Sequence, residues 1–276
     1  MTVHEIQDDG TIKAIHKVTG GPYGGIKVNE EFESLLEELF GAENLKRYQR
    51  KSPSDWLSLM NEFEGKKRGK RILDSGLMTN IRLPRSFVSL VKQSQSPAME
   101  RYGDKDVKLK SNEYLSLSSG MMKKLFSTVV ERIKEHLKKL HKKSQLSKVQ
   151  IMLLVGGFAE SALLQEEIKN EFSGRCKILI PNHASIAVVQ GAVLFGKKPA
   201  KITQRIVSTT YGADCSRDFI YGLHTEEKKF VVDGTEMRNN IFECFVKENE
   251  VVKLGKKVKK TYHPLRADDR RLHVGF

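Results

Sequence analysis

The sequence is poor in cysteine and has no long apolar run. Its three cysteines, Cys176, Cys215 and Cys244, are far apart and show no C-x-x-C spacing. That spacing argues against a disulfide framework and against a zinc site. It favours a reducing compartment, for which we expect the cytoplasm, with the nucleus as an alternative. No apolar stretch approaches the ~20 residues that a membrane helix needs, so we expect no membrane span. The first residues, MTVHEIQDDG, lack the basic start and apolar middle of a signal peptide.

The two standard phosphate-binding fingerprints are absent as well. Neither G-x-x-x-x-G-K-[ST] nor G-x-G-x-x-G occurs in the chain. The histidines show no metal-ligand spacing apart from His136 and His141, which are five positions apart in a charged segment expected to be helical. We therefore expect no metal site.

Positive charge is what the sequence has in excess. Lysine and arginine outnumber aspartate and glutamate by 48 to 34, which gives a formal net charge of +14. Such a surplus favours partners that carry phosphate, such as nucleic acid, anionic lipid or nucleotide. Much of it lies in the clusters at 65–71, 138–143 and 253–260, which would also suit the solvated faces of helices and hairpins. Aromatic residues are not interleaved with these clusters, so we do not expect nucleic acid as the partner.

The first forty residues predict a hairpin, a glycine-rich loop and a helix. In TVHEIQDDGTIKAIHKV, two alternating segments flank the turn DDG, as in a hairpin. The segment TGGPYGG (19–25) is too rich in glycine for anything but a loop. The helix VNEEFESLLEELFG would begin at the cap Asn29 and end at Gly41. Its buried stripe is predicted to consist of Phe32, Leu35, Leu36 and Leu39.

The rest of the chain predicts an α/β architecture followed by a β-rich region. Residues 44–71 suggest helix, 80–93 a strand and a short helix, and a long amphipathic helix begins at Ser118. VQIMLLVGG is expected to be a strand of a parallel sheet, buried on both faces, and CKILIP a second buried strand. A helix with Leu164, Ile168 and Phe172 on one face lies between them, and the Ala/Gly-rich helix ASIAVVQGAVLFG, which could lie close to the sheet, follows. After residue 201, IVSTTYGADC, DFIYGLH and KKFVVDGTEM suggest short strands.

The turn at Gly156-Gly157 is the first candidate site. It joins an apolar strand to a helix and places bare backbone at the carboxyl edge of the sheet, where α/β folds bind ligands. Glycine lets a flat base or a sugar approach the main chain, because no Cβ intervenes. No Lys-Ser/Thr pair follows, so the turn suits a nucleoside better than phosphates. A tight strand–helix connection that binds nothing is equally compatible with the turn alone.

Several separated motifs resemble a known family. LLVGGFAESALLQEEI, ILIP and ASIAVVQGAVLFG resemble the adenosine-binding signature of the actin-like ATPase superfamily, in its 70 kDa heat-shock branch. VGGFAES, TGGPYGG with VNEEFE, and GAVLFG are most similar to the divergent heat shock 70 kDa protein 12 subgroup. The resemblance implies an α/β fold, namely the second lobe of an actin-like ATPase, with a sheet flanked by helices. That lobe would span residues 1–200, with a helical lid subdomain inserted at about 44–115, and a partial β-rich region would cover 201–276.

The resemblance also implies roles for particular residues. Gly156 and Gly157 match the glycines that lie against the adenosine of bound ATP or ADP. In FEGKKR, Glu64, Lys67 and Arg68 match residues that reach the adenine and the ribose. Their i, i+3 and i+4 spacing places them on one helical face. Gly24 and Gly25 match a glycine loop on the phosphate side. Protein clients or co-chaperones would be further partners.

Departures from the family pattern limit the expected chemistry. Glu160 occupies the position where other members carry the arginine that stacks on adenine, and Ser185 lies near that of an acidic residue. The Asp-Gly-x-Thr-like loops of the family are absent, so the resemblance implies a chain truncated at the N-terminus, without the first lobe. Half of the site cannot orient a water or complete a magnesium site, so we expect no catalysis by this chain alone.

Three hypotheses follow from the sequence. The first is the adenine-nucleotide-binding lobe of an incomplete or degenerate ATPase of the heat-shock type. The second is a basic module for nucleic acid or anionic surfaces. The third is a non-catalytic scaffold that binds proteins through an exposed apolar face.

Overall fold

The computed structural model describes residues 1–74, 76–93, 97–266 and 268. Helices make up 46% and strands 24% of the chain, and the sheets are flanked by helices, so the fold is mixed α/β as expected. Contacts within the chain divide it into two compact units, Gly20–Val193 and Met1–Thr19 with Leu194–Phe276. The lobe, lid and β-rich boundaries expected from the sequence stay a prediction.

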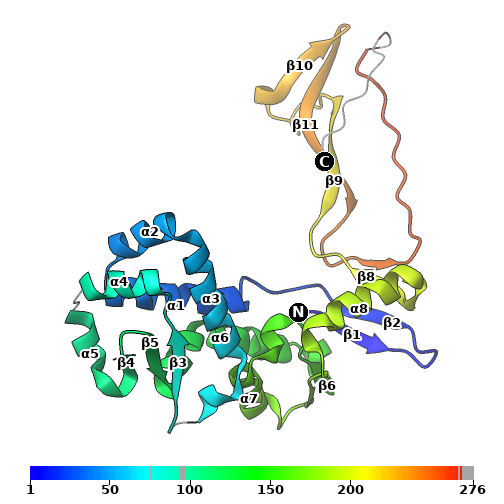
Figure 1. Ribbon diagram of the computed structural model, residues 1–276. Coiled ribbons are helices and arrows are strands. Elements are labelled where there is room, and N and C mark those ends of the chain that lie inside the picture. The colour runs from blue at the N-terminus through cyan, green and yellow to red at the C-terminus, as the bar shows by residue number, and fades with distance from the viewer. Residues whose placement is uncertain (75, 94–96, 267, 269–276) are drawn as a thin grey trace. The chain divides into compact units, whose positions relative to one another are not determined.

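The unit Gly20–Val193 contains most of the helices and two small sheets (Figure 1). Its α-helices, the last of which runs on into the other unit, are α1 (Gly25–Phe40), α2 (Ala42–Lys51), α3 (Pro53–Arg68), α4 (Arg85–Gln93), α5 (Pro97–Asp106), α6 (Ser119–His141), α7 (Ala162–Phe172) and α8 (Ala184–Lys197). Its 3-10 helices are η1 (Lys70–Leu73), η2 (Ser144–Leu146) and η3 (Gly157–Glu160). Its strands are β3 (Met78–Arg82), β4 (Val107–Lys110), β5 (Tyr114–Ser118), β6 (Ile151–Leu153) and β7 (Lys177–Leu179). The first three form an antiparallel sheet in the order β3-β5-β4, and β6 pairs with β7 in parallel.

Helix α1 begins earlier than the sequence suggested. It starts at Gly25 with Gly24 as the cap residue, so the expectation that Asn29 caps the helix was wrong. Asn29 lies in the second turn, where its side chain is free to bond to another helix instead of to its own backbone. Gly41 ends the helix in a left-handed conformation with φ 86°, as predicted. All four residues of the predicted apolar stripe are buried.

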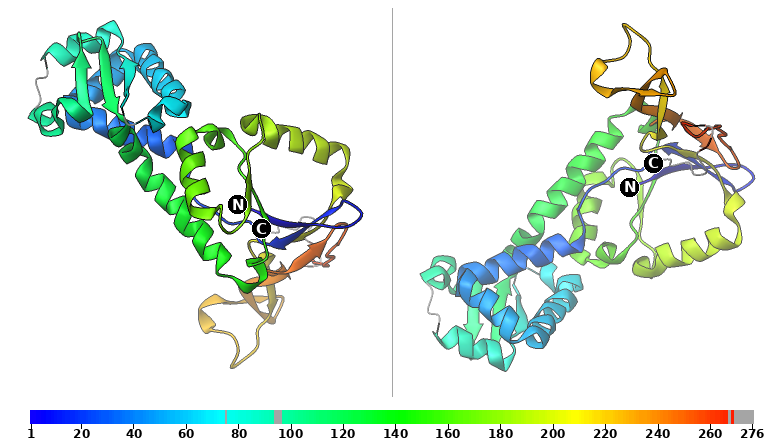
Figure 2. Two further views of the ribbon diagram at one scale, coloured as in Figure 1. Left: turned by 90° about the horizontal axis from the view of Figure 1, so that it is seen from below. Right: turned by 90° about the horizontal axis from the view of Figure 1, so that it is seen from above.

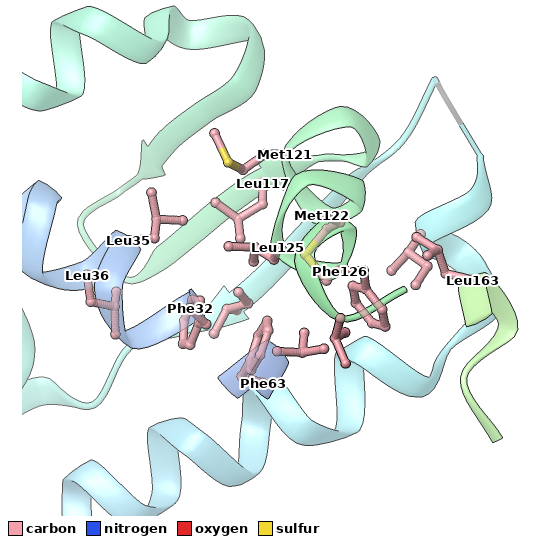
Figure 3. Packing of buried hydrophobic residues seen from close by; sticks show 14 of the residues in the cluster. Phe32, Leu35, Leu36, Phe63, Leu117, Met121, Met122, Leu125, Phe126 and Leu163 are labelled. Atoms are coloured by element: carbon pink, nitrogen blue, oxygen red, sulfur yellow. The ribbon is translucent and has the colours of Figure 1, made fainter. Parts of the chain in front are cut away.

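A single hydrophobic core holds this unit together. Phe32 of α1 stacks on Phe63 of α3 with ring centroids 3.9 Å apart, and neither side chain is exposed. Figure 3 shows both rings beside Leu125 and Phe126 of α6. The pattern of one apolar side chain every three or four residues on each helix produces this arrangement, because it brings one stripe from each helix to a shared interior.

Helix α6 connects the two sheets of this unit. Ser118 caps it by accepting a hydrogen bond from the backbone N–H of Met121 at 3.0 Å, in agreement with the predicted start. The helix contacts β3 and β5 near its beginning and α7 further along, and both views of Figure 2 show it running between these parts of the unit. It therefore joins the core around Phe63 to the segment that contains the Gly-Gly turn.

Strands β6 and β7 form a parallel pair, as predicted, but β6 is not buried on both faces. Ile151 and Leu153 are 49% and 61% exposed, whereas Met152 and Leu154 pack against the core. The physical reason is that alternate residues of a strand point to opposite faces. The core covers only one face of this two-stranded sheet, so the expected burial of the other face was wrong.

The second unit consists largely of strands. It contains the 3-10 helices η4 (Pro199–Lys201) and η5 (Glu226–Lys228). A sheet in the order β1-β2-β8-β12 consists of β1 (Val3–Ile6), β2 (Ile12–His16), β8 (Ile202–Ile206) and β12 (Val251–Lys253). A second sheet, in the order β10-β11-β9, consists of β9 (Tyr211–Asp218), β10 (Lys229–Val232) and β11 (Thr235–Val246). Strands β1 and β2 form the expected hairpin.

One strand predicted in this unit is a turn. Strand β9 ends at Asp218, and most of DFIYGLH folds back on itself, with the backbone N–H of His224 donating to the carbonyl of Ile220 at 3.0 Å. The ring of Phe219 packs edge-on against those of Tyr221 and His224. The aromatic side chains of this segment pack on one another in a local cluster instead.

Candidate functional site

A pocket opens between α1, α3 and the Gly-Gly turn, all within the unit Gly20–Val193. Its volume is about 480 Å³, including the part open to solvent. The residues that line it are Gly25, Ile26, Glu64, Lys67, Arg68, Gly157, Phe158 and Ser161. It thus brings together five of the residues singled out in the sequence, from three segments far apart in the chain. Gly24 and Gly156 are the chain neighbours of lining residues but do not line the pocket themselves.

The last turns of α3 supply the charged side chains of the pocket. Pro53 sits at the start of this helix, where its missing N–H costs nothing, and the helix ends at Arg68 before Gly69. Ser161, which is buried, donates from its hydroxyl to the carbonyl of Lys67 at 3.4 Å. That hydrogen bond ties the end of α3 to the segment after the Gly-Gly turn.

Lys67 is buried and fully engaged inside the protein. Its side chain is only 4% exposed. The ammonium group donates to the carbonyl of Gly25 at 2.9 Å and to Oδ1 of Asn29 at 2.7 Å, and it lies 2.5 Å from Oε2 of Glu64. Burial lowers the pKa of Lys67 from its ordinary value, and the contact with Glu64 offsets this only in part. An ammonium group has three N–H donors, and all three have acceptors here.

Glu64 is the centre of this polar network. Its Oε2 accepts from Lys67 and from Nδ2 of Asn29, the latter at 3.2 Å, and its Oε1 accepts from Nε and Nη2 of Arg68 at 3.2 and 3.0 Å. Burial raises the pKa of Glu64, but the hydrogen bonds from Lys67, Asn29 and Arg68 outweigh burial and hold the pKa below its ordinary value. The carboxylate is therefore ionised at neutral pH.

Arg68 lies between two carboxylates. Besides its two hydrogen bonds to Glu64, its Nη1 lies 3.4 Å from Oε2 of Glu160. Arginine has five N–H donors, so N–H groups remain on both Nη atoms, and the side chain is 45% exposed. Of the three charged residues that the sequence assigned to the nucleoside, Arg68 alone keeps donors for another molecule.

Glu160 connects the site to the start of α8. Its Oε1 accepts from the backbone N–H of Ser185 at 3.1 Å, in the first turn of that helix. The hydrogen bond from Ser185 lowers the pKa of Glu160, and the charge of Arg68 lowers it further. The acidic residue that departs from the family pattern thus has two partners of positive character.

The glycines of the site differ in the space that surrounds their Cα atoms. Gly156 has φ 94°, a left-handed conformation that favours glycine. A Cβ built on Gly157 or Gly24 would meet no atom within 4 Å. A Cβ on Gly25 would lie 3.2 Å from Nζ of Lys67 and 3.2 Å from the ring of Phe158. Gly25 therefore permits the close packing of Lys67 and Phe158 at the pocket, whereas Gly157 presents open backbone.

Sequence reasoning missed several residues around the pocket. Phe158 follows Gly157 directly, and its ring stacks on that of Phe126 with centroids 6.0 Å apart. Ile26 is exposed at the first turn of α1, and Ser161 is buried beneath the turn. Asn29 was interpreted as a helix cap. Its position four residues after Gly25, and so on the same face of α1, was the signal that could have placed it near the site.

The part of the chain that the structure describes shows neither a metal-binding cluster nor a membrane-spanning helix. No group of three or more His, Cys, Asp or Glu side chains is placed there to hold a metal ion. No helix among the same residues is both long and apolar enough to cross a membrane.

The fold is the first indication of the class of protein. A mixed α/β arrangement with sheets flanked by helices is consistent with a lobe of an actin-like ATPase. No protein-family model matches the chain. Curated relatives do match it over nearly its whole length.

The chain is 38% identical over 269 residues to heat shock 70 kDa protein 12A of Mus musculus and also to that of Homo sapiens. Each alignment covers 96% of the chain and 40% of the relative. It is 34% identical over 282 residues to heat shock 70 kDa protein 12B of Homo sapiens, which covers 100% of the chain and 41% of that relative. These similarities support its assignment as heat shock 70 kDa protein 12-like, an atypical member of the 70 kDa heat-shock-like family. The chain spans about 40% of the length of the curated relatives that it matches.

Proposed function

We propose that the chain forms an adenine-nucleotide-binding lobe of an atypical 70 kDa heat-shock-like protein, with ATP or ADP as the ligand. The observation that carries this proposal is the single pocket lined by Gly25, Glu64, Lys67, Arg68 and Gly157. These residues come from separated segments, and the sequence resemblance assigns each of them to the nucleotide.

The residues of the pocket fit a nucleoside. Gly157 leaves its backbone open, so a flat base can approach it without meeting a side chain. The exposed guanidinium group of Arg68 can stack on an aromatic ring and donate hydrogen bonds. Glu160, at the position where the resemblance predicts a second arginine, accepts a hydrogen bond from Nη1 of that guanidinium. ATP or ADP would therefore lie against Arg68 and Gly157.

Hydrolysis is not part of this proposal. The residues around the pocket supply neither Asp-Gly-x-Thr-like phosphate loops nor a residue placed to orient a water, so a complete magnesium site is not expected from this chain. The three cysteines are free thiols, and we place the protein in a reducing compartment, the cytoplasm or the nucleus.

Calorimetric titration of the full chain with ADP and ATP at millimolar concentration tests the proposal. We expect binding heat that Gly157→Trp abolishes, because the indole would fill the pocket. Gly157→Ala is the matched control, since its Cβ meets nothing within 4 Å and should leave binding intact. The proposal fails if the native chain gives no heat, or if the tryptophan variant binds as the native chain does.

A protein-binding surface is the second candidate function. Ile186, Val188, Val189 and Val193 of α8 are 47–67% exposed. Contiguous exposed apolar side chains mark contact sites for other proteins, which in this family would be clients or co-chaperones. We expect Val188→Asp with Val193→Asp to reduce binding of an unfolded model polypeptide while ADP binding is retained. Equal capture by both forms would rule out this surface.

A further inference from the structure

Asn29 of α1 lies between two oppositely charged side chains of α3. Its Oδ1 accepts from the ammonium group of Lys67 at 2.7 Å, and its Nδ2 donates to Oε2 of Glu64 at 3.2 Å. An ammonium group can only donate, and an ionised carboxylate can only accept. The amide is a side chain that serves both, and these two partners fix its orientation. Asn29 is therefore a bridge that neither an apolar side chain nor a carboxylate of the same shape could replace.

Lys67 and Glu64, which Asn29 joins, have few unused hydrogen-bonding groups for a ligand. All three N–H groups of Lys67 have acceptors, and the carboxylate of Glu64 accepts hydrogen bonds on both oxygens from three residues. Arg68 is the exception, because N–H groups on its two Nη atoms remain and the side chain is 45% exposed. Within the network, Arg68 is thus the side chain that can contact a ligand, and the other side chains hold Arg68 in place.

We propose that Asn29 is a positioning residue of the pocket, which acts through Lys67 and Glu64 to hold Arg68 in the orientation that binds the ligand. This inference rests on the proposed adenine-nucleotide binding. It assigns direct contact to Arg68 and an indirect role to the other three. Asn29 does not line the pocket, so it affects binding only through the side chains that it touches.

The same network fixes the start of α1. Lys67 donates to the carbonyl of Gly25, the first residue of that helix and part of the pocket wall. Loss of the Asn29 amide leaves Lys67, whose side chain is 4% exposed, with an unused donor and leaves Glu64 without one of its hydrogen bonds. Both side chains must then shift, and Arg68 shifts with Glu64 because two hydrogen bonds join them.

Calorimetric titration of the full chain with ADP tests the inference. Asn29→Asp keeps the shape of the side chain but presents an oxygen to Glu64, and Asn29→Leu removes both hydrogen bonds. We expect each to raise the Kd for ADP about tenfold. Ser34→Ala, on an exposed position of the same helix, is the matched control and should stay within about twofold of the native chain. A role in packing alone predicts native affinity for Asn29→Asp.

A double-mutant cycle tests the route through Lys67. If Asn29 acts through that residue, the variant with Asn29→Asp and Lys67→Met binds ADP within about twofold of Lys67→Met alone. Losses that multiply would overturn this route, and native affinity in Asn29→Asp and Asn29→Leu would overturn the inference while the proposed function stands. Absence of ADP binding in the native chain would overturn both. Fluorescence of Trp56 reports whether each variant is folded. If Asn29→Asp does not fold, the ADP affinity of Asn29→Leu tests the inference.

Discussion

Replacement of Lys67 by methionine should destabilise the unit Gly20–Val193 by about 2–3 kcal/mol. The side chain is 4% exposed, and its ammonium group has three acceptors. Removal of one partner of a buried ion pair costs about 3–5 kcal/mol, because the other charge is left uncompensated. Two features reduce this figure. Glu64 is 32% exposed and keeps its hydrogen bonds from Arg68, and the methionine side chain still buries apolar surface.

The unfolding of this unit can be followed through Trp56, which is the only tryptophan of the chain. It lies in α3, the helix that carries Lys67, and packs against the core. Urea titration with tryptophan fluorescence therefore reports this unit without interference from the other. With a urea dependence of about 1–3 kcal/mol per molar, a loss of this size moves the midpoint down by roughly 0.7–3 M.

Lys66→Met is the control for this prediction. Lys66 is the preceding residue, is exposed, and forms an ion pair with Glu62 at 3.3 Å. Exposed pairs of this kind contribute about 0.2–1 kcal/mol, so we expect a much smaller shift. Equal midpoints for the two variants would show that the network around Lys67 does not stabilise the unit, and the reasoning given above for that network would be refuted.

Three other predictions use the same unit. Phe63→Ala should lower the free energy of unfolding by about 3–5 kcal/mol in the tryptophan assay, because it removes the stack on Phe32 from a position with no exposure; a loss below about 1 kcal/mol would contradict this packing. The pKa of Glu64 is lowered in the folded protein, so its carboxylate stabilises the fold above the ordinary pKa of 4.5, and this stability is lost as the pH falls through the lowered value. Glu64→Gln should therefore flatten the fall in stability below about pH 4.5, measured by urea titration at several pH values, and an unchanged slope would count against the ionised network. Burial raises the pKa of the Cys176 thiol, so a thiol reagent should modify it more slowly than the other two cysteines until urea unfolds the protein; equal rates would contradict its burial.

Much of the fold could be predicted because local patterns and tertiary packing agree. The stripe on α1, the start of α6 near Ser118 and the turn of the β1–β2 hairpin each follow a local pattern, and the structure has each as expected. Burial of β6 was mispredicted for a tertiary reason. A run of apolar residues does not tell how many faces of a strand have neighbours, and the core covers only one face here.

The candidate site shows the same division. Motif spacing placed Glu64, Lys67 and Arg68 on one face of a helix, and the resemblance to a family associated them with Gly157 and with Gly25. The structure lines one pocket with these residues. Whether they bind a nucleotide stays a prediction. Spacing could not show which charged groups are already satisfied, because that depends on Asn29, which lies 38 positions before Lys67 in the chain.

The sequence by itself indicated most of the local elements and five of the residues that line the pocket. Helical period, glycine turns and caps act over a few residues, so they can be recognised without knowledge of the tertiary structure. Tertiary structure alone decided that Lys67 is buried and fully hydrogen-bonded, that Arg68 keeps free N–H groups, and that Glu160 bonds to the start of α8. The physical reason is that burial and hydrogen-bond satisfaction depend on the atoms that surround a group, and those atoms come from distant parts of the chain.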